Sequence, residues 1–127
     1  MEDIEIQPTA TTPKISFHPR EGHFEISGKS LPENSYDFFQ PLLDYVEAYA
    51  EAPQEATKLV FKLQYFNTNS TSQFLRMIKK FEKIHAAGKN VEVHWFYDEE
   101  DEDMKEAGED FKVLLRLPIL IKGIPLE

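Results

Sequence analysis

Two segments in which apolar and polar residues alternate, separated by a helix-like stripe, constrain this chain most. Residues 58–66 (KLVFKLQYF) and 91–97 (VEVHWFY) carry apolar side chains at every second position. Alternation predicts strands of a sheet with one well-covered face and one partly wet face. Between them, residues 74–85 carry apolar side chains at helical spacing, and Gly88 follows as a stop signal. Such a strand–helix–strand unit predicts parallel strands joined by a right-handed crossover.

Further elements precede this unit. Residues 15–18 and 23–27 are two short segments around Pro-Arg-Glu-Gly, which predicts a hairpin. Apolar residues at helical spacing follow from Tyr36 to Ala50. Asn34 and Asp37, three residues apart, predict a capping pair at the start of this helix.

Two more elements follow the unit. Residues 104–115 show a second helical stripe, and residues 117–124 form a last strand, which Pro118 places at a sheet edge. The predicted fold class is therefore α/β, a mixed five-stranded sheet in the order β-β-α-β-α-β-α-β with helices mainly on one face. We expect a single domain over residues 14–127 behind a flexible leader, residues 1–13.

Composition narrows the functional class. The chain has 127 residues, no cysteine and a formal net charge of -9, so a disulfide framework and a thiol nucleophile are excluded and nucleic acid is a poor partner. The acidic start lacks the apolar core of a secretory signal, and apolar runs are far shorter than a membrane helix needs. We expect a cytoplasmic protein without membrane insertion.

The residues suggest neither an enzyme nor a metal site. No Gly-rich phosphate loop, nucleophile elbow or acid pair on adjacent helical turns is present, and no cofactor is expected. The acidic run 98–103 lacks the central Gly of a calcium loop and is interpreted as a solvated loop whose last acids favour the next helix start. The four histidines show no metal spacing; they are His18, His23, His85 and His94.

The turn at residues 65–73 (YFNTNSTSQ) is the most informative segment, because it places four hydroxyls and two Asn between a strand and a helix. One interpretation is capping, with Ser70 and Gln73 as a capping box. The other is a phosphoacceptor, since a helix N-terminus accommodates a phosphate and Thr68 lies just before the helix. If the strands are parallel, this turn, the run 98–103 and Asn34 emerge at one sheet edge, where partners tend to bind.

Two family resemblances rest on these residues. The strand–turn–helix around Asn67-Thr68-Asn69-Ser70 resembles the phosphorylated turn of STAS domains, although Asn stands where those domains have Asp and no Gly follows. The chain is more similar to the SiaC-type family of bacterial regulatory phosphoproteins than to STAS domains, and this resemblance covers almost all of the chain after Pro13. Three stretches carry this resemblance: Leu31 to Ser35, Tyr65 to Ser70, and Trp95 to Asp98 with Glu106 to Phe111.

The SiaC-type resemblance implies a STAS-like fold and a phosphorylation cycle. A Ser/Thr protein kinase would phosphorylate Thr68 and a PP2C-like phosphatase would remove the phosphate. The unphosphorylated protein would bind and activate a diguanylate cyclase, raising cyclic di-GMP and favouring biofilm. The expected partner-binding residues are Pro32, Glu33, Asn34, Ser35, Asn67, Asn69 and Ser70. The alternatives are an anti-sigma-factor antagonist in a partner-switching cascade and a small-molecule-sensing STAS-like module.

Overall fold

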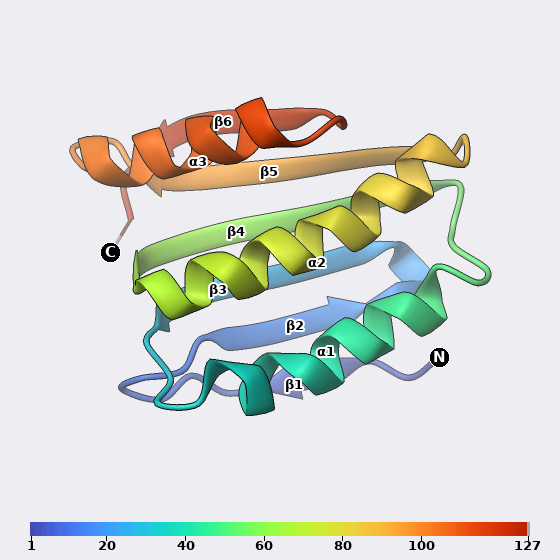
Figure 1. Ribbon diagram of the computed structural model, residues 1–127, viewed down its shortest axis with the longest axis horizontal. Helices are drawn as coiled ribbons and strands as arrows, with labels where there is room; N and C mark the ends of the chain where they lie inside the picture. The colour runs from blue at the N-terminus through green and yellow to red at the C-terminus, as the bar shows by residue number, and fades with distance from the viewer. Residues whose placement is uncertain (127) are drawn as a thin grey trace.

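The computed structural model describes residues 1–126 and shows one six-stranded sheet with three helices over one face (Figure 1). The strands are β1 (Ile4–Ile6), β2 (Lys14–His18), β3 (His23–Ser30), β4 (Ala56–Phe66), β5 (Asn90–Asp98) and β6 (Ile119–Ile124). The helices are the 3-10 turn η1 (Pro19–Glu21), α1 (Ser35–Tyr49), α2 (Thr68–Ala86) and α3 (Glu102–Leu114). None of the helices in this part of the chain is long and apolar enough to cross a membrane.

The sheet is mixed, as the sequence predicts. Its strands lie in chain order, β1 to β6. The β1–β2 and β2–β3 pairs are antiparallel, whereas β3–β4, β4–β5 and β5–β6 are parallel. Each parallel pair is joined through one helix, and Figure 1 shows α1, α2 and α3 on the same side of the sheet. β6 lies at an edge, which confirms the predicted position of the last strand, but it begins at Ile119, directly after Pro118, rather than at Leu117.

The strand count differs from the prediction. Six strands are present instead of five, because β1 (Ile4–Ile6) forms inside residues 1–13, where a flexible leader was expected. The reason is local: Ile4 and Ile6 pack against the core, and Glu5 between them points to the other face of the sheet, where Ser16 donates a hydrogen bond to it. Two apolar residues are too short a signal to distinguish an edge strand from a tail.

The core lies between the sheet and the helices and is rich in aromatic rings. Phe24 contacts Tyr49 of α1 and Phe81 of α2 edge to face, and Phe61 contacts Phe74 of α2 in the same way. Such pairs contribute about 0.5–1.5 kcal/mol beyond the apolar area that they bury. These contacts fix α1 and α2 on the sheet and thereby fix where each helix begins.

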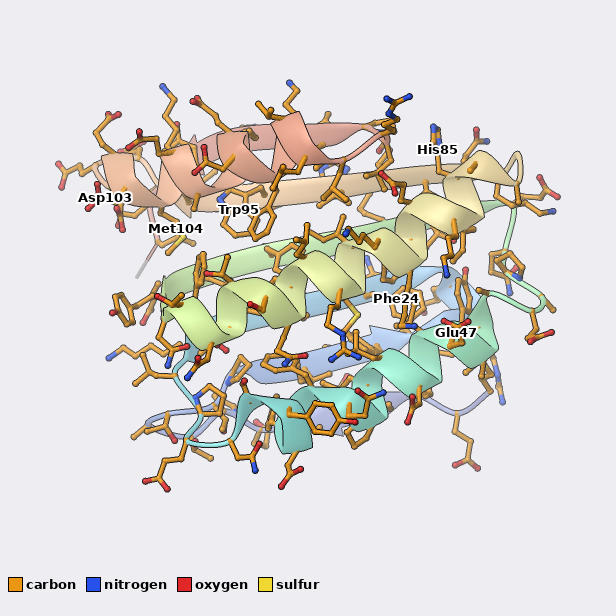
Figure 2. The ribbon with its side chains drawn as sticks, in the orientation of Figure 1. Phe24, Glu47, His85, Trp95, Asp103 and Met104 are labelled. Carbon is orange, nitrogen blue, oxygen red and sulfur yellow. The ribbon has the colours of Figure 1, made fainter. Side chains whose placement is uncertain are left out.

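Helix α3 is fixed by Trp95 of β5 (Figure 2). The indole Nε1 donates to the carbonyl of Met104 at 2.9 Å, and the ring packs on Phe111. Gly108 crosses directly over the indole, where a Cβ would lie 2.4 Å from Trp95 Cδ1. The close approach sets the position of the acidic segment before α3.

Candidate partner-binding edge

Three helices begin at one edge of the sheet. Because β3, β4 and β5 are mutually parallel, their carboxyl ends point the same way, and α1, α2 and α3 start beside them (left in Figure 1). The inferred strand direction is therefore confirmed. We call this region the helix-start edge and define it as residues 32–36, 65–71 and 98–104.

Asn67 caps α2. Its Oδ1 accepts a hydrogen bond from the backbone N–H of Ser70 at 3.0 Å, so the predicted Ser70–Gln73 capping box is wrong. The helix starts earlier than that box requires, because Asn67 already satisfies an N–H group of the first turn. Gln73 instead accepts from Arg76 at 3.1 Å. The residue after the cap, Thr68, is therefore the first residue of α2.

Thr68 is exposed, and within residues 1–126 its side chain makes no hydrogen bond. It lies at the positive end of a 19-residue helix dipole whose first turn carries no acid. A phosphate at this position would replace no native contact and would meet the N–H groups of a helix start. Thr68 is thus available for modification, unlike the buried Ser70 and unlike Thr71, whose hydroxyl bonds the Asn67 carbonyl.

Ser70 has the opposite environment, although it lies two residues away. It is fully buried; its Oγ donates to the Ser30 carbonyl at 2.9 Å and lies 2.7 Å from Ser30 Oγ. These bonds join the end of β3 to the start of α2. The Ser70 hydroxyl is used to hold the fold, and its contact with a partner stays a prediction.

The start of α1 also combines residues with a structural role and residues that are exposed. Asn34 caps the helix: its Oδ1 accepts from the Asp37 N–H at 3.1 Å and its Nδ2 donates to the Asp37 carboxylate at 2.8 Å, which confirms the capping pair. Pro32 is buried, and its predicted place on the partner surface stays a prediction. Glu33, Asn34 and Asn69 are exposed, whereas Ser35 and Asn67 are half-buried; a partner role for these five residues stays a prediction.

The acidic run serves as a helix start. Asp101 caps α3 by accepting from the Met104 N–H at 3.1 Å, and Asp98 accepts from the Glu100 N–H at 3.0 Å. Glu102 and Asp103 lie in the first turn, where the helix dipole favours negative charge. Part of this charge is therefore structural, and the rest gives this end of the edge a negative surface.

Two exposed aromatic residues were missed by the sequence analysis. Tyr36 and Tyr65 are 56% and 55% exposed, although their spacing matches the core-facing stripes. Tyr65 lies near the end of β4 and lines a hollow together with Asp101, Asp103 and Ala107. Tyr36 lies at the start of α1, and Tyr65 follows a register shift in β4 after which Phe66 packs against the core in its place. Aromatic residues of this kind are typical of interface centres.

Helix α2 carries four basic residues on successive turns, and two of them bind α1; the four are Arg76, Lys79, Lys80 and Lys83. Arg76 donates to Gln40 of α1 at 3.0 Å and lies over the Tyr36 ring. Lys80 forms an ion pair with Glu47 of α1 at 2.5 Å, and its hydrogen bond and charge lower the pKa of that carboxyl. These contacts fasten α1 to α2 and hold Tyr36 in place.

Comparison with known proteins gives one consistent result. The model of the SiaC family regulatory phosphoprotein matches residues 6–123. A protein of Pseudomonas aeruginosa (strain UCBPP-PA14) is 32% identical over 123 residues, which covers 97% of this chain and 98% of the relative.

Solved structures agree with this match. Apo-SiaC from Pseudomonas aeruginosa has a TM-score of 0.89 at 31% identity, covering 97% of this chain and 100% of that one. A chain in the crystal structure of the diguanylate cyclase SiaD in complex with its activator SiaC, from the same organism, has a TM-score of 0.90 at 31% identity. That match covers 96% of this chain and 100% of the other.

Proposed function

Because the chain belongs to the SiaC family of regulatory phosphoproteins, we propose that it acts in the cytoplasm as a phosphorylation-controlled activator of a diguanylate cyclase. The unphosphorylated form binds the cyclase through the helix-start edge, and phosphorylation of Thr68 releases it. The observation that supports this proposal most is the free, exposed hydroxyl of Thr68 at the first position of α2, between the capping Asn67 and the buried Ser70. The SiaC relative in complex with SiaD supports the class of partner.

The chemistry of the edge suggests how the phosphate acts. A docked partner covers Tyr36 and Tyr65, the exposed aromatic residues of this edge. A phosphate adds about -1.5 to -2 charges at pH 7, and its burial beneath a partner costs free energy unless new cations meet it. The acidic start of α3, which shares a hollow with Tyr65, adds to the negative potential that such a partner would meet. The phosphate therefore opposes docking without unfolding the domain.

The proposal also names the enzymes that set the state of the switch. A Ser/Thr protein kinase adds the phosphate and a PP2C-like phosphatase removes it, while this chain acts by binding rather than by catalysis. The exposed first turn of α2 leaves Thr68 accessible to both enzymes. Thr71 is also exposed, but its hydroxyl donates to the Asn67 carbonyl at 3.3 Å, so Thr68 is the preferred acceptor.

Phosphosite mapping with the matching kinase tests the site. We expect phosphate on Thr68 and none on Ser70, whose hydroxyl is buried. A chain that stays unmodified while the kinase phosphorylates a control substrate would contradict the proposed switch.

Paired substitutions test the mechanism. Thr68→Ala should bind the cyclase as the wild type does and should stay bound in the presence of kinase and ATP. Thr68→Glu should bind more weakly. Ser72→Glu is the matched control, because Ser72 is exposed one turn further along α2 and receives the same charge. Equal binding by Thr68→Glu and Ser72→Glu would refute a position-specific charge effect.

A further inference from the structure

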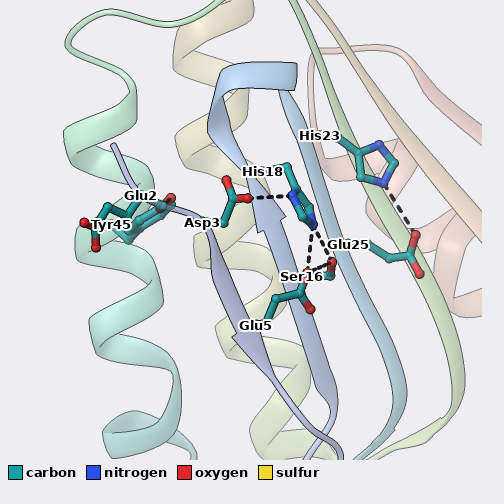
Figure 3. Close-up of polar contacts among 8 residues, drawn as sticks. All are labelled: Glu2, Asp3, Glu5, Ser16, His18, His23, Glu25 and Tyr45. Carbon is teal, nitrogen blue, oxygen red and sulfur yellow. Dashed lines mark hydrogen bonds and ion pairs between the residues drawn. The ribbon is translucent and has the colours of Figure 1, made fainter.

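The N-terminal strand β1 has three residues and is the first strand in the order of the sheet, whereas α2 and α3 of the helix-start edge begin beside β4 and β5. It pairs with β2 alone, in antiparallel register from Ile4 opposite Phe17 to Ile6 opposite Ile15. Ahead of it, the Tyr45 hydroxyl of α1 donates a hydrogen bond to the Glu2 carbonyl (Figure 3). An edge strand this short needs side-chain contacts to remain docked.

His18, at the end of β2, supplies those contacts. Its Nδ1 lies 3.0 Å from Asp3 Oδ2 and its Nε2 lies 2.8 Å from Glu5 Oε1 (Figure 3). Ser16 Oγ donates to the same Glu5 oxygen at 2.7 Å and lies 3.0 Å from His18 Nε2. Both ring nitrogens of one histidine thus face carboxylates carried by the strand or the residue just before it.

This geometry distinguishes the two protonation states of the ring. An imidazolium carries a proton on each nitrogen and donates to Asp3 and Glu5 together. A neutral imidazole has one proton, so one nitrogen presents a lone pair toward a carboxylate; at Nε2 the Ser16 hydroxyl can donate to that lone pair only by giving up its hydrogen bond to Glu5. One attraction is then lost, and a repulsion takes its place.

We propose that β1 is a strap controlled by protonation: it is docked on β2 while His18 is protonated and loosens when His18 loses its proton. Loosening uncovers the outer backbone edge of β2 and the Ile4 and Ile6 side of the core. The strap is a property of this chain that goes beyond the phosphorylation switch, and it operates at a different edge of the sheet.

The charges around His18 determine the direction of the effect. Asp3 and Glu5 face it from β1, Lys14 lies on β2, and the turn η1 adds Arg20 and Glu21, which line a hollow with Glu2 and His18. On β3, His23 lies opposite His18 in register, and Glu25 is two residues further along the same strand.

Desolvation alone would lower the pKa of His18, but the hydrogen bonds and charges of Glu5 and Asp3 outweigh it and raise the pKa. The hydrogen bond from Ser16, together with His18, lowers the pKa of Glu5, which therefore stays ionised near neutral pH. Because the folded pKa of His18 exceeds its ordinary value of 6.5, the docked strand is stabilised fully below that pH. The stabilisation is lost as the pH rises through the folded pKa.

Two other histidines on the same sheet face do not bridge strands in this way. His23 pairs with Glu25 at 3.5 Å, and both residues belong to β3. His94 pairs with Glu92 at 3.0 Å, and both belong to β5. Protonation of either histidine changes a contact within one strand, so His94→Gln is a matched control for His18→Gln.

Amide exchange of residues 4–6, measured by NMR between pH 5.5 and 8.0 and expressed as protection factors, tests the proposal directly. In the wild type we expect protection to fall several-fold, with a midpoint at the pKa of the His18 ring measured in the same samples. His18→Gln should show the low protection at every pH, and His94→Gln should follow the wild type.

Either of two results would overturn the proposal: wild-type protection of β1 that does not vary with pH, or unchanged protection in His18→Gln. Amides of β4 and β5 report whether the core stays intact. If His18→Gln disturbs them, Glu5→Gln carries the test, because it removes one carboxylate and should move the midpoint of both the ring titration and the β1 protection to lower pH.

Discussion

The two hydroxyls at the start of α2 show how differently neighbouring residues of one turn are used. Ser70 is buried and joins β3 to α2, whereas Thr68 is exposed and makes no hydrogen bond within residues 1–126. The molecule as a whole shows the same contrast. Side chains on the covered face of the sheet hold the helices in place, whereas Thr68, Tyr36 and Tyr65 on the helix-start edge remain exposed. We therefore expect single substitutions to separate the structural role of Ser70 from the proposed switch at Thr68.

The largest expected effect is at the covered face. Gly108→Val places a Cβ 2.4 Å from Trp95 Cδ1, where it can be accommodated only by moving α3 or the indole. Overpacking of this kind costs about 1–3 kcal/mol and occasionally more, so we expect about 3 kcal/mol of destabilisation. Urea unfolding followed by Trp95 fluorescence measures it.

Val113→Ala is the control for that change, because Val113 lies on the same helix and is 85% exposed. It should alter the free energy of unfolding by less than about 0.5 kcal/mol. If both variants were equally stable, the close packing of α3 on Trp95 would not determine the position of the acidic segment.

Comparing the stability of Ser70→Ala with that of Thr68→Ala tests whether the two hydroxyls differ in their structural role. Removing the Ser70 hydroxyl leaves the buried Ser30 hydroxyl without its partner, and an unsatisfied buried group costs about 1–3 kcal/mol. Thr68→Ala should change stability by less than about 0.5 kcal/mol. Similar losses in the two variants, measured by chemical denaturation, would remove the distinction between the two hydroxyls.

Tyr65→Ala should weaken partner binding and leave stability almost unchanged. Because the side chain is 55% exposed, we expect little change in unfolding free energy, but a loss of about tenfold in affinity for the cyclase, or roughly 1.4 kcal/mol. Isothermal titration calorimetry measures the affinity. Leu120→Ala is the control, because Leu120 is also exposed but lies on β6, outside the helix-start edge. Equal affinities for the two variants would place the contact elsewhere.

Much of this architecture was predictable from local sequence. The alternation in residues 58–66 and 91–97 and the helical stripe between them predicted parallel strands on a shared edge, which β4, α2 and β5 confirm. Asn34 was predicted as part of a capping pair because its partner lies only three residues away. Interactions over so short a distance are visible in the sequence.

The errors arose where long-range contacts decide the outcome. Ser70 is buried because Ser30, 40 residues earlier, meets it, and no local pattern reveals that bond. Ile4 and Ile6 form a strand because β2 and the core receive them. Tyr65 continues an apolar alternation in the sequence, but a register shift in β4 interrupts that alternation, so Phe66 contacts Phe74 and Trp95 in the core while Tyr65 is exposed. The sequence thus pointed to the candidate site and to its exposed polar members, but not to its two exposed tyrosines, Tyr36 and Tyr65.

One binding titration decides whether phosphate on Thr68 controls binding to the cyclase. The wild type and Thr68→Ala are treated identically with kinase and ATP, modification is verified by mass spectrometry, and each is titrated into the diguanylate cyclase. The account predicts that the treated wild type loses affinity while treated Thr68→Ala binds like the untreated protein. Undiminished binding by wild type that is fully phosphorylated at Thr68 would contradict it.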